Sequence, residues 1–188
     1  MQRRFRMVAS LQLGFWARLF AALSLGGSLA AETAIVEARA DARLHLEGRT
    51  EILLLDFRTA SIATWEIRKA TLLLHVQEGE PPKMLLISLV PARWTEDAPE
   101  RAAAGLFRHS GRFQVRVLEQ GWIQVELSPS FVAALAREQS FGLAVEQKNF
   151  RLHGRKPPQF AFVLLVEGGP QSSGGMSPVR RTDENKTK

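Results

Sequence analysis

Three short apolar runs between residues 51 and 90 constrain the fold more than any other feature of the sequence. They occupy residues 52–57, 71–76 and 84–89, and polar connectors separate them. Each run is about six residues long and carries apolar side chains on both faces of an extended chain, because side chains alternate with period two. A run of that length predicts a buried β-strand rather than a helix.

The connectors suggest how these strands are joined. Residues 77–82 include Gly79, Pro81 and Pro82, which are typical of turns. The simplest topology makes the second and third runs antiparallel neighbours. Residues 59–69 form the other connector, in which Ile62 and Trp65 are predicted to lie across an open end of the core.

Alternating apolar residues predict further strands on both sides of this stretch. The segments are residues 34–38, 42–47, 113–117, 123–127, 141–145 and 160–166. Ser128 and Pro129 suit the N-cap and first position of a short helix. The sequence therefore predicts an all-β fold, an antiparallel jelly-roll or β-sandwich of about eight or nine strands with one short helix.

Several segments, taken in order, resemble a known family. They are LLLDFRTASIATWEIRKATLLLHV, LLISLVPARWTEDA, GWIQVELSPSFVAAL, FGLAVEQ and FRLHGRKPPQFAFVLL. Together they resemble the DNRLRE-domain proteins, which are similar to carbohydrate-binding module family 96. The resemblance covers residues 42–166, with a shortened N-terminal part and without the family's second Trp after W-T-E. It implies a jelly-roll sandwich that binds polysaccharide.

The distribution of charge argues against a nucleic-acid partner, although the net charge is +6. Residues 1–30 contain four Arg and no acid, whereas residues 31–166 contain 17 basic and 16 acidic residues, a net of +1. Residues 101–166 carry nine basic residues against four acidic ones, which predicts one basic surface.

The two ends of the chain are predicted to lie outside the folded domain. Residues 1–30 read as a signal peptide, with a basic start, an apolar stretch and a small-x-small cleavage site at Ser28 and Ala30. The alternative is an uncleaved anchor over residues 11–31. Residues 31–166 form the domain, and the Gly/Ser/Pro-rich residues 167–188 form a disordered tail. The predicted location is extracytoplasmic, periplasmic or secreted, with no membrane contact after cleavage.

Catalytic and metal-binding patterns are missing from the sequence. There is no Cys, no G-x-S-x-G motif and no Gly-rich phosphate loop, and none of the four His shows zinc-ligand spacing. We therefore predict no enzyme activity, no cofactor and no metal. His75 is placed where it could pair with Asp56 across neighbouring strands.

The candidate ligand-binding residues are one aromatic residue and a set of basic ones. Trp94 and Trp122 are predicted to be core residues, whereas Trp65 is the better candidate for an exposed sugar-stacking ring. A basic groove for an acidic polysaccharide would draw on residues near Arg108, His109 and His153. The predicted site residues are Trp65, Arg112, Arg116, Lys148, Arg151, Arg155 and Lys156.

The sequence leaves two main functional hypotheses, with a small hydrolase as a third. The first, implied by the resemblance, is non-catalytic binding of a polysaccharide outside the cytoplasm, with acidic glycans favoured because Arg pairs well with carboxylates. The second is a structural or adhesive module of the cell envelope that binds a protein partner.

Overall fold

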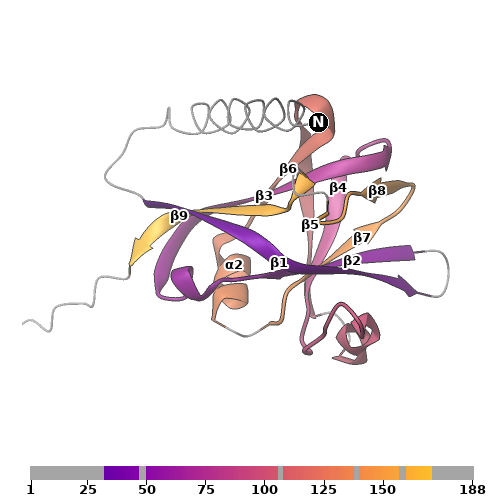
Figure 1. Ribbon diagram of the computed structural model, residues 1–188. Helices are drawn as coiled ribbons and strands as arrows, with labels where there is room; N and C mark the ends of the chain where they lie inside the picture. Colours follow the sequence, from indigo (N-terminus) through magenta and orange to yellow (C-terminus); the bar gives the residue numbers. More distant parts are fainter. Residues whose placement is uncertain (1–31, 47–49, 106–107, 138–139, 157–159, 171–188) are drawn as a thin grey trace, which may run out of the picture.

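The computed structural model of the chain describes residues 32–46, 50–105, 108–137, 140–156 and 160–170. These residues form nine strands, drawn in sequence colours in Figure 1. The strands are β1 (Glu32–Leu46), β2 (Thr50–Phe57), β3 (Trp65–Gly79), β4 (Met84–Leu89), β5 (Arg108–Val117), β6 (Trp122–Leu127), β7 (Leu143–Gln147), β8 (Phe150–Leu152) and β9 (Val163–Pro170). The helical segments are η1 (Ala60–Ile62), η2 (Pro99–Gly105), η3 (Glu119–Gly121) and α2 (Pro129–Ala136).

Eight of these strands close on themselves as a barrel. The neighbours run in the order β6-β5-β4-β7-β2-β1-β9-β3, and β3 pairs back to β6. Every pairing in this ring is antiparallel, and β8 adds to β3 outside it. The prediction of an antiparallel all-β fold is thus confirmed. The expected sandwich is corrected in one respect, because its sheet edges pair with each other and close the barrel.

Two strands close the ring by changing partners along their length. Residues 32–37 of β1 pair with β9, and the rest of β1 pairs with β2, with an irregular register between Ala38 and Ala40. Likewise β5 pairs first with β4 and then, from Val115 to Val117, with β6. Strands that bend at irregular positions form the corners between packed sheets. The two short strands predicted at 34–38 and 42–47 are therefore one bent strand.

The predicted pairing of the second and third apolar runs is wrong. Those runs lie in β3 and β4, but β3 pairs with β6, β8 and β9, whereas β4 pairs with β5 and β7. Consecutive strands are neighbours only about two-thirds of the time, and a turn-rich connector is compatible with a crossover as well as a hairpin. β3 is also longer than predicted, since it begins at Trp65 inside the expected connector.

The barrel interior is filled by apolar side chains from every wall. Side chains that are fully buried in this main core include Leu53, Leu55, Leu72, Leu74, Leu85, Ile87, Ile123 and Phe162. Each is worth about 1.5–3 kcal/mol when fully buried, which makes this core the dominant stabilising contribution. Ile62 is fully buried in it and Trp65 packs against it from the side, in agreement with the prediction that both lie across the core.

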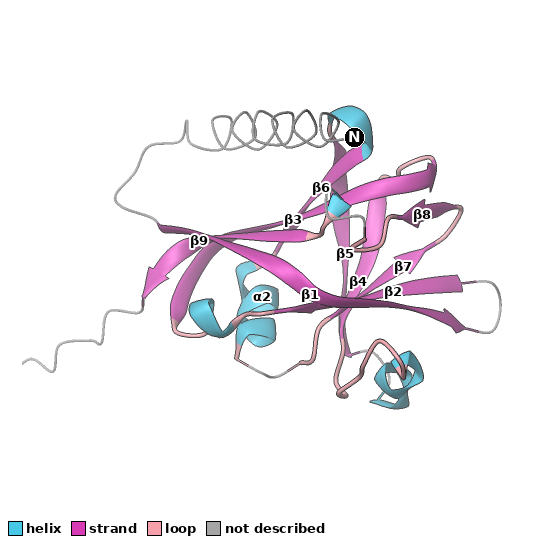
Figure 2. Ribbon diagram, viewed as in Figure 1, coloured by secondary structure: helices cyan, strands magenta, loops and turns pink. Residues whose placement is uncertain are grey.

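Two smaller apolar clusters lie outside the main core. The first contains Ile52, Leu54, Val90, Ala102 and Ala144, with Leu44 and Trp94 packed against it. The segment that ends in η2 covers it, and Figure 2 shows this turn outside the strands, below β2 and β7 in the view. The second, called here the β3/β9 outer cluster, contains Leu73, Trp122, Val163 and Leu165, with Leu118 and Phe160 packed against it.

Helix α2 connects β6 to β7 along the chain and packs against the main core. The side-chain oxygen of Ser128 accepts a hydrogen bond from the backbone N–H of Phe131 at 3.3 Å, and Pro129 occupies the first turn. The predicted cap and the predicted helix are therefore confirmed. Phe131, Val132 and Leu135 enter the main core, so the helix is held by packing as well as by its cap.

The last strand extends past the predicted end of the domain. Residues 167–170 belong to β9 and pair with β3, with Gly168 opposite Ile67. A Cβ atom at Gly168 would lie 2.3 Å from the backbone oxygen of Glu66, so the glycine permits this close approach. The predicted leader and the remainder of the predicted tail, residues 171–188, lie outside the described residues.

Candidate functional site

A groove opens where β5 and β6 separate. The two strands pair only through Val115–Val117 and Ile123–Val125, after which β5 continues along β4 and β6 continues along β3. The groove has a volume of about 600 Å³. We call it the fork groove; its lining includes Arg112, Phe113, Gln114, Arg116, Gln124 and Glu126.

Main-chain groups along the β5 wall of the fork groove point into it. The N–H of Val115 donates to the Lys83 carbonyl, so odd-numbered residues of β5 direct their backbone groups toward β4. Even-numbered residues such as Arg112 and Gln114 therefore direct theirs toward β6. No strand pairing among the described residues uses this side of Arg112 or Gln114, because the β5–β6 ladder begins at Val115. The groove thus offers backbone donors and acceptors.

The side chains around the groove are polar at the rim and apolar at the floor. Arg112, Gln114 and Arg116 are exposed, and the two guanidinium groups make no ion pair within the described part of the chain. Phe113 lies at the floor with its ring centroid 5.2 Å from that of Phe131. With Glu126 as the facing acid, the charged residues of the lining sum to +1.

The structure separates the predicted site residues into different places. Arg112 and Arg116 lie at the fork groove. Lys148 forms an ion pair with Glu146 at 2.7 Å, and Lys156 is exposed after β8. Trp65 lies at the far end of β3, paired with Pro170, while Arg151 follows β7 near the other end of β3. A single basic groove that contains all seven residues is therefore not what the chain forms.

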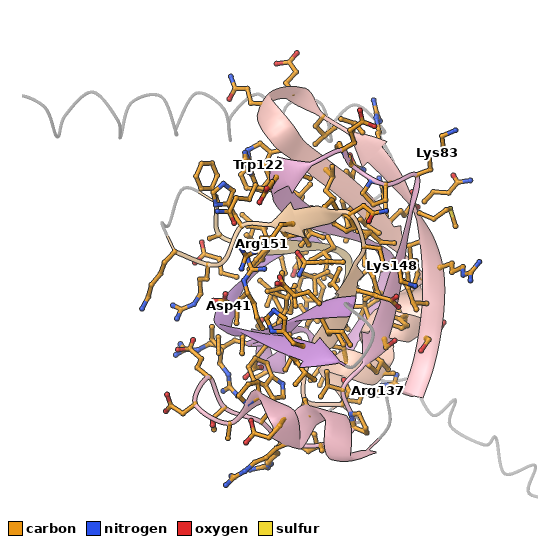
Figure 3. The ribbon with its side chains drawn as sticks, turned by 90° about the vertical axis from the view of Figure 1, so that its right-hand side faces the viewer. Asp41, Lys83, Trp122, Arg137, Lys148 and Arg151 are labelled. Atoms are coloured by element: carbon orange, nitrogen blue, oxygen red, sulfur yellow. The ribbon has the colours of Figure 1, made fainter. Side chains whose placement is uncertain are left out.

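Arg151 and Arg155 belong to a network of ion pairs at one end of the barrel, called here the mouth network. Glu51 is its centre: its carboxylate contacts Arg43, His45 Nε2 at 3.3 Å and Arg151 Nε at 3.6 Å. It also accepts a hydrogen bond from Gln147 Nε2 at 3.0 Å. Figure 3 looks toward this end, with Asp41 and Arg151 on one side of it and Lys148 on the other.

The second half of the mouth network fixes Arg155. Its Nε lies 3.5 Å from Asp41 Oδ1, and its Nη2 donates to Glu96 Oε1 at 2.9 Å. The sequence predicted these arginines as ligand contacts, but acids that are distant in sequence already neutralise them. In the structure Arg151 ties β8 to β2, and Arg155 ties the chain after β8 to Asp41 on β1 and to Glu96.

The four tryptophans of the sequence include three in the described part, and none stands free on the surface. Trp122 is 5% exposed, which confirms it as a core residue. Trp94 is half-buried and its Nε1 donates to the Phe141 carbonyl at 2.9 Å. Trp65 is partly buried against the main core, so the expected exposed stacking ring is not present at that position.

The structure also corrects the histidine pairing suggested by the sequence. Asp56 forms an ion pair with Arg39 at 2.5 Å rather than with His75. His75 Nε2 donates to the Gln120 carbonyl at 2.8 Å, and its ring packs against His153 and Phe160. β3 and β2 are not neighbours in the barrel, so His75 and Asp56 are separated.

Sequence reasoning missed Gln124 and Glu126 as groove residues. Their alternation with Ile123, Val125 and Leu127 indicated exposure, but only the pairing of Gln124 with Arg116 and the divergence of β5 from β6 beyond it place them in one groove with Arg112 and Gln114. Among the described residues, no group of three or more His, Cys, Asp or Glu is arranged to hold a metal ion. Within the same residues, no helix has the length and apolar character needed to cross a membrane.

No protein-family model matches the chain. No curated protein shows significant sequence similarity to it.

Proposed function

We propose that the chain is a non-catalytic polysaccharide-binding module that acts outside the cytoplasm, and that its ligand lies in the fork groove. The observation that carries this proposal is a groove lined by two arginines that form no ion pair with any described residue, together with main-chain groups on the same wall that no described strand pairs with. Guanidinium, amide and backbone groups supply the donors and acceptors that sugar hydroxyls require.

The ligand that suits this lining best is an acidic glycan. Arg112 and Arg116 are on the same exposed face of β5, with Gln114 between them on that face. Each guanidinium matches the geometry of a carboxylate, and among the described residues neither has an acidic partner that a ligand would have to displace. Binding would then depend on charge and hydrogen bonds rather than on stacking, because Trp65 lies elsewhere and is partly buried.

We further propose that the closed barrel is a flattened jelly roll related to the DNRLRE-domain proteins. The ring divides into two four-stranded sheets, β1-β9-β3-β6 and β2-β7-β4-β5, joined where β1 meets β2 and β5 meets β6. Two sheets of four strands with crossover connections are the arrangement expected of a jelly roll. This connectivity supports the resemblance noted in the sequence.

One observation favours a second function, that of a structural or adhesive envelope module. The unpaired backbone groups of β5 beside the groove would also accept an extended peptide as an added strand. A protein partner would then bind through main-chain hydrogen bonds, and replacing an arginine side chain would weaken it little.

Affinity electrophoresis through gels that contain neutral or acidic polysaccharides separates these functions. The wild-type chain should be retarded by at least one acidic polymer in moderate salt, and Arg112→Ala or Arg116→Ala should reduce that retardation. Arg101→Ala is the matched control, since it removes one exposed positive charge from η2, outside the groove lining.

Three outcomes are informative. The proposal is contradicted if Arg101→Ala reduces the retardation as much as the groove variants do. It is also contradicted if every polyanion retards the chain and salt abolishes the effect, because both results indicate binding to diffuse charge. An absence of retardation by any polysaccharide favours the envelope module. Arg151→Ala and Arg155→Ala should lower stability more than binding, because both arginines hold the mouth network.

A further inference from the structure

His75 on β3 and His153, directly after β8, lie side by side on neighbouring segments of the sheet. The backbone N–H of His153 donates to the carbonyl of His75 at 2.8 Å, one step beyond the Val76–Leu152 pairing of β3 with β8. Residues paired in this way project from the same face of a sheet, and the two ring centroids are 4.9 Å apart. His75 is 9% exposed and His153 is partly buried, so water reaches the pair poorly.

An aromatic side chain joins the two imidazoles. The ring of Phe160 is stacked on His153 with centroids 4.1 Å apart, and it lies 4.2 Å from His75. Trp122 meets His75 edge-on at 5.2 Å. Phe160 and Trp122 both belong to the β3/β9 outer cluster, so the histidine pair forms one border of that cluster.

The hydrogen bonds of His75 suit a neutral ring. A carbonyl can only accept, so Nε2 carries the proton that is donated to Gln120. Nδ1 is buried and forms no hydrogen bond of normal geometry within the described residues. Burial therefore lowers the pKa of His75 below 6.5, and it outweighs the carbonyls of Gln120 and Val76, which act in the opposite direction.

The surroundings of His153 also oppose its protonation. Burial is the largest cause that lowers the pKa of His153 below 6.5, and the positive charges of His75 and of Arg43 on β1 lower it further. The other packed elements present neutral groups: η3 presents the Gln120 carbonyl, β6 presents Trp122, and the chain before β9 presents Phe160. Arg43 is itself paired with Glu51.

We propose that the His75–His153 pair is an acid-sensitive latch, which holds His153 and Phe160 against β3 at neutral pH and releases them when the histidines take up protons. Like charges placed directly opposite each other on paired chains repel, and a charged imidazole is better solvated by water than by Phe160 and Trp122. Release would uncover the β3/β9 outer cluster and would leave the fork groove intact, because that groove is built by β5 and β6.

The direction and limit of the effect follow from proton linkage. Because the closed form has the lower pKa, it is fully favoured above pH 6.5 and loses its advantage as the pH falls below 6.5. A released histidine with an ordinary pKa near 6.5 increases the open population by at most about 30-fold at pH 5. If both histidines are protonated on release, the increase in the open population is the product of the two individual increases.

Hydrogen–deuterium exchange of the full chain at pH 7.5 and 5.0, corrected for intrinsic rates, tests the latch. Peptides that cover residues 150–162 should show at least a fivefold rise in opening at pH 5.0, whereas peptides from β4 should not. His153→Gln should reduce the rise, and the double variant His75→Gln/His153→Gln should abolish it. The control His45→Gln, which removes an exposed histidine outside the pair, should keep it.

The proposal is overturned by an opening that does not change with pH, or by the same rise in His153→Gln. Imidazole NMR titration of the wild-type chain provides a second measurement that needs no variant. Both His75 and His153 should titrate below pH 6.5, and titration of either at or above 6.5 contradicts the latch. Glycan binding tests the fork groove separately, so the two proposals fail independently.

Discussion

Replacement of Glu51 by Gln should destabilise the chain strongly while changing its shape little. Glu51 faces the barrel interior, since its neighbour on β7 is the buried Gln147, and its side chain is 18% exposed. The substitution removes the negative charge from a carboxylate that contacts Arg43, His45 and Arg151. It leaves Arg43, whose side chain is only 22% exposed, without an ion-pair partner among the described residues.

The expected cost can be estimated from burial. Removing one partner of a fully buried ion pair costs about 3–5 kcal/mol. About a fifth of each side chain still meets water, and Arg43 keeps its hydrogen bond to the Leu152 carbonyl at 2.6 Å, so solvent and that bond reduce the loss. We therefore expect a loss of about 2–3 kcal/mol in the free energy of unfolding, or roughly 10 °C in Tm for a domain of this size.

Urea denaturation followed by circular dichroism measures this loss directly. Glu146→Gln is the matched control, because it breaks an ion pair with Lys148, whose side chain is 70% exposed; such pairs are worth about 0–1 kcal/mol. The double variant Arg43→Met/Glu51→Leu should recover part of the stability, since it removes the poorly exposed charge of Arg43 together with its partner, while the Arg151 side chain is 46% exposed and stays solvated. A loss below about 0.5 kcal/mol in Glu51→Gln would refute the reasoning that this network is buried enough to matter.

Three further predictions concern the cap, a close contact and pH. Ser128→Ala should lower stability by about 1 kcal/mol in urea denaturation, through loss of the α2 cap, and an unchanged midpoint would contradict this. Gly168→Ala should cost about 1–3 kcal/mol because the new Cβ meets backbone, whereas Gly169→Ala, with open space around it, should be tolerated; equal effects would exclude the clash. The free energy of unfolding should fall between pH 7.5 and 5.5, because burial lowers the pKa values of His75 and His153 in the folded state and the unfolded chain takes up more protons. The double variant His75→Gln/His153→Gln should flatten that slope, and an unchanged slope would assign it to other groups.

Local features of the fold could be predicted because they depend on neighbouring residues alone. The run at 84–89 coincides with β4, and the alternation of Ile123, Val125 and Leu127 coincides with β6. Ser128 and Pro129 mark the start of α2 as expected. Side-chain period and capping chemistry act over a few residues, so the sequence contains the information directly.

The tertiary structure alone decided which strands pair and which charged residues remain free. β3 and β4 are adjacent in sequence but lie in different parts of the ring, because partners are selected by the burial of whole faces rather than by the connector. Arg151 and Arg112 look alike in sequence, but the fold brings Glu51 to the first, whereas no acid in the described part of the chain comes into ion-pairing distance of the second. The fork groove has the same origin, since it exists only where β5 and β6 follow different neighbours. Those contacts join residues far apart along the chain, so a pattern with a period of two cannot encode them.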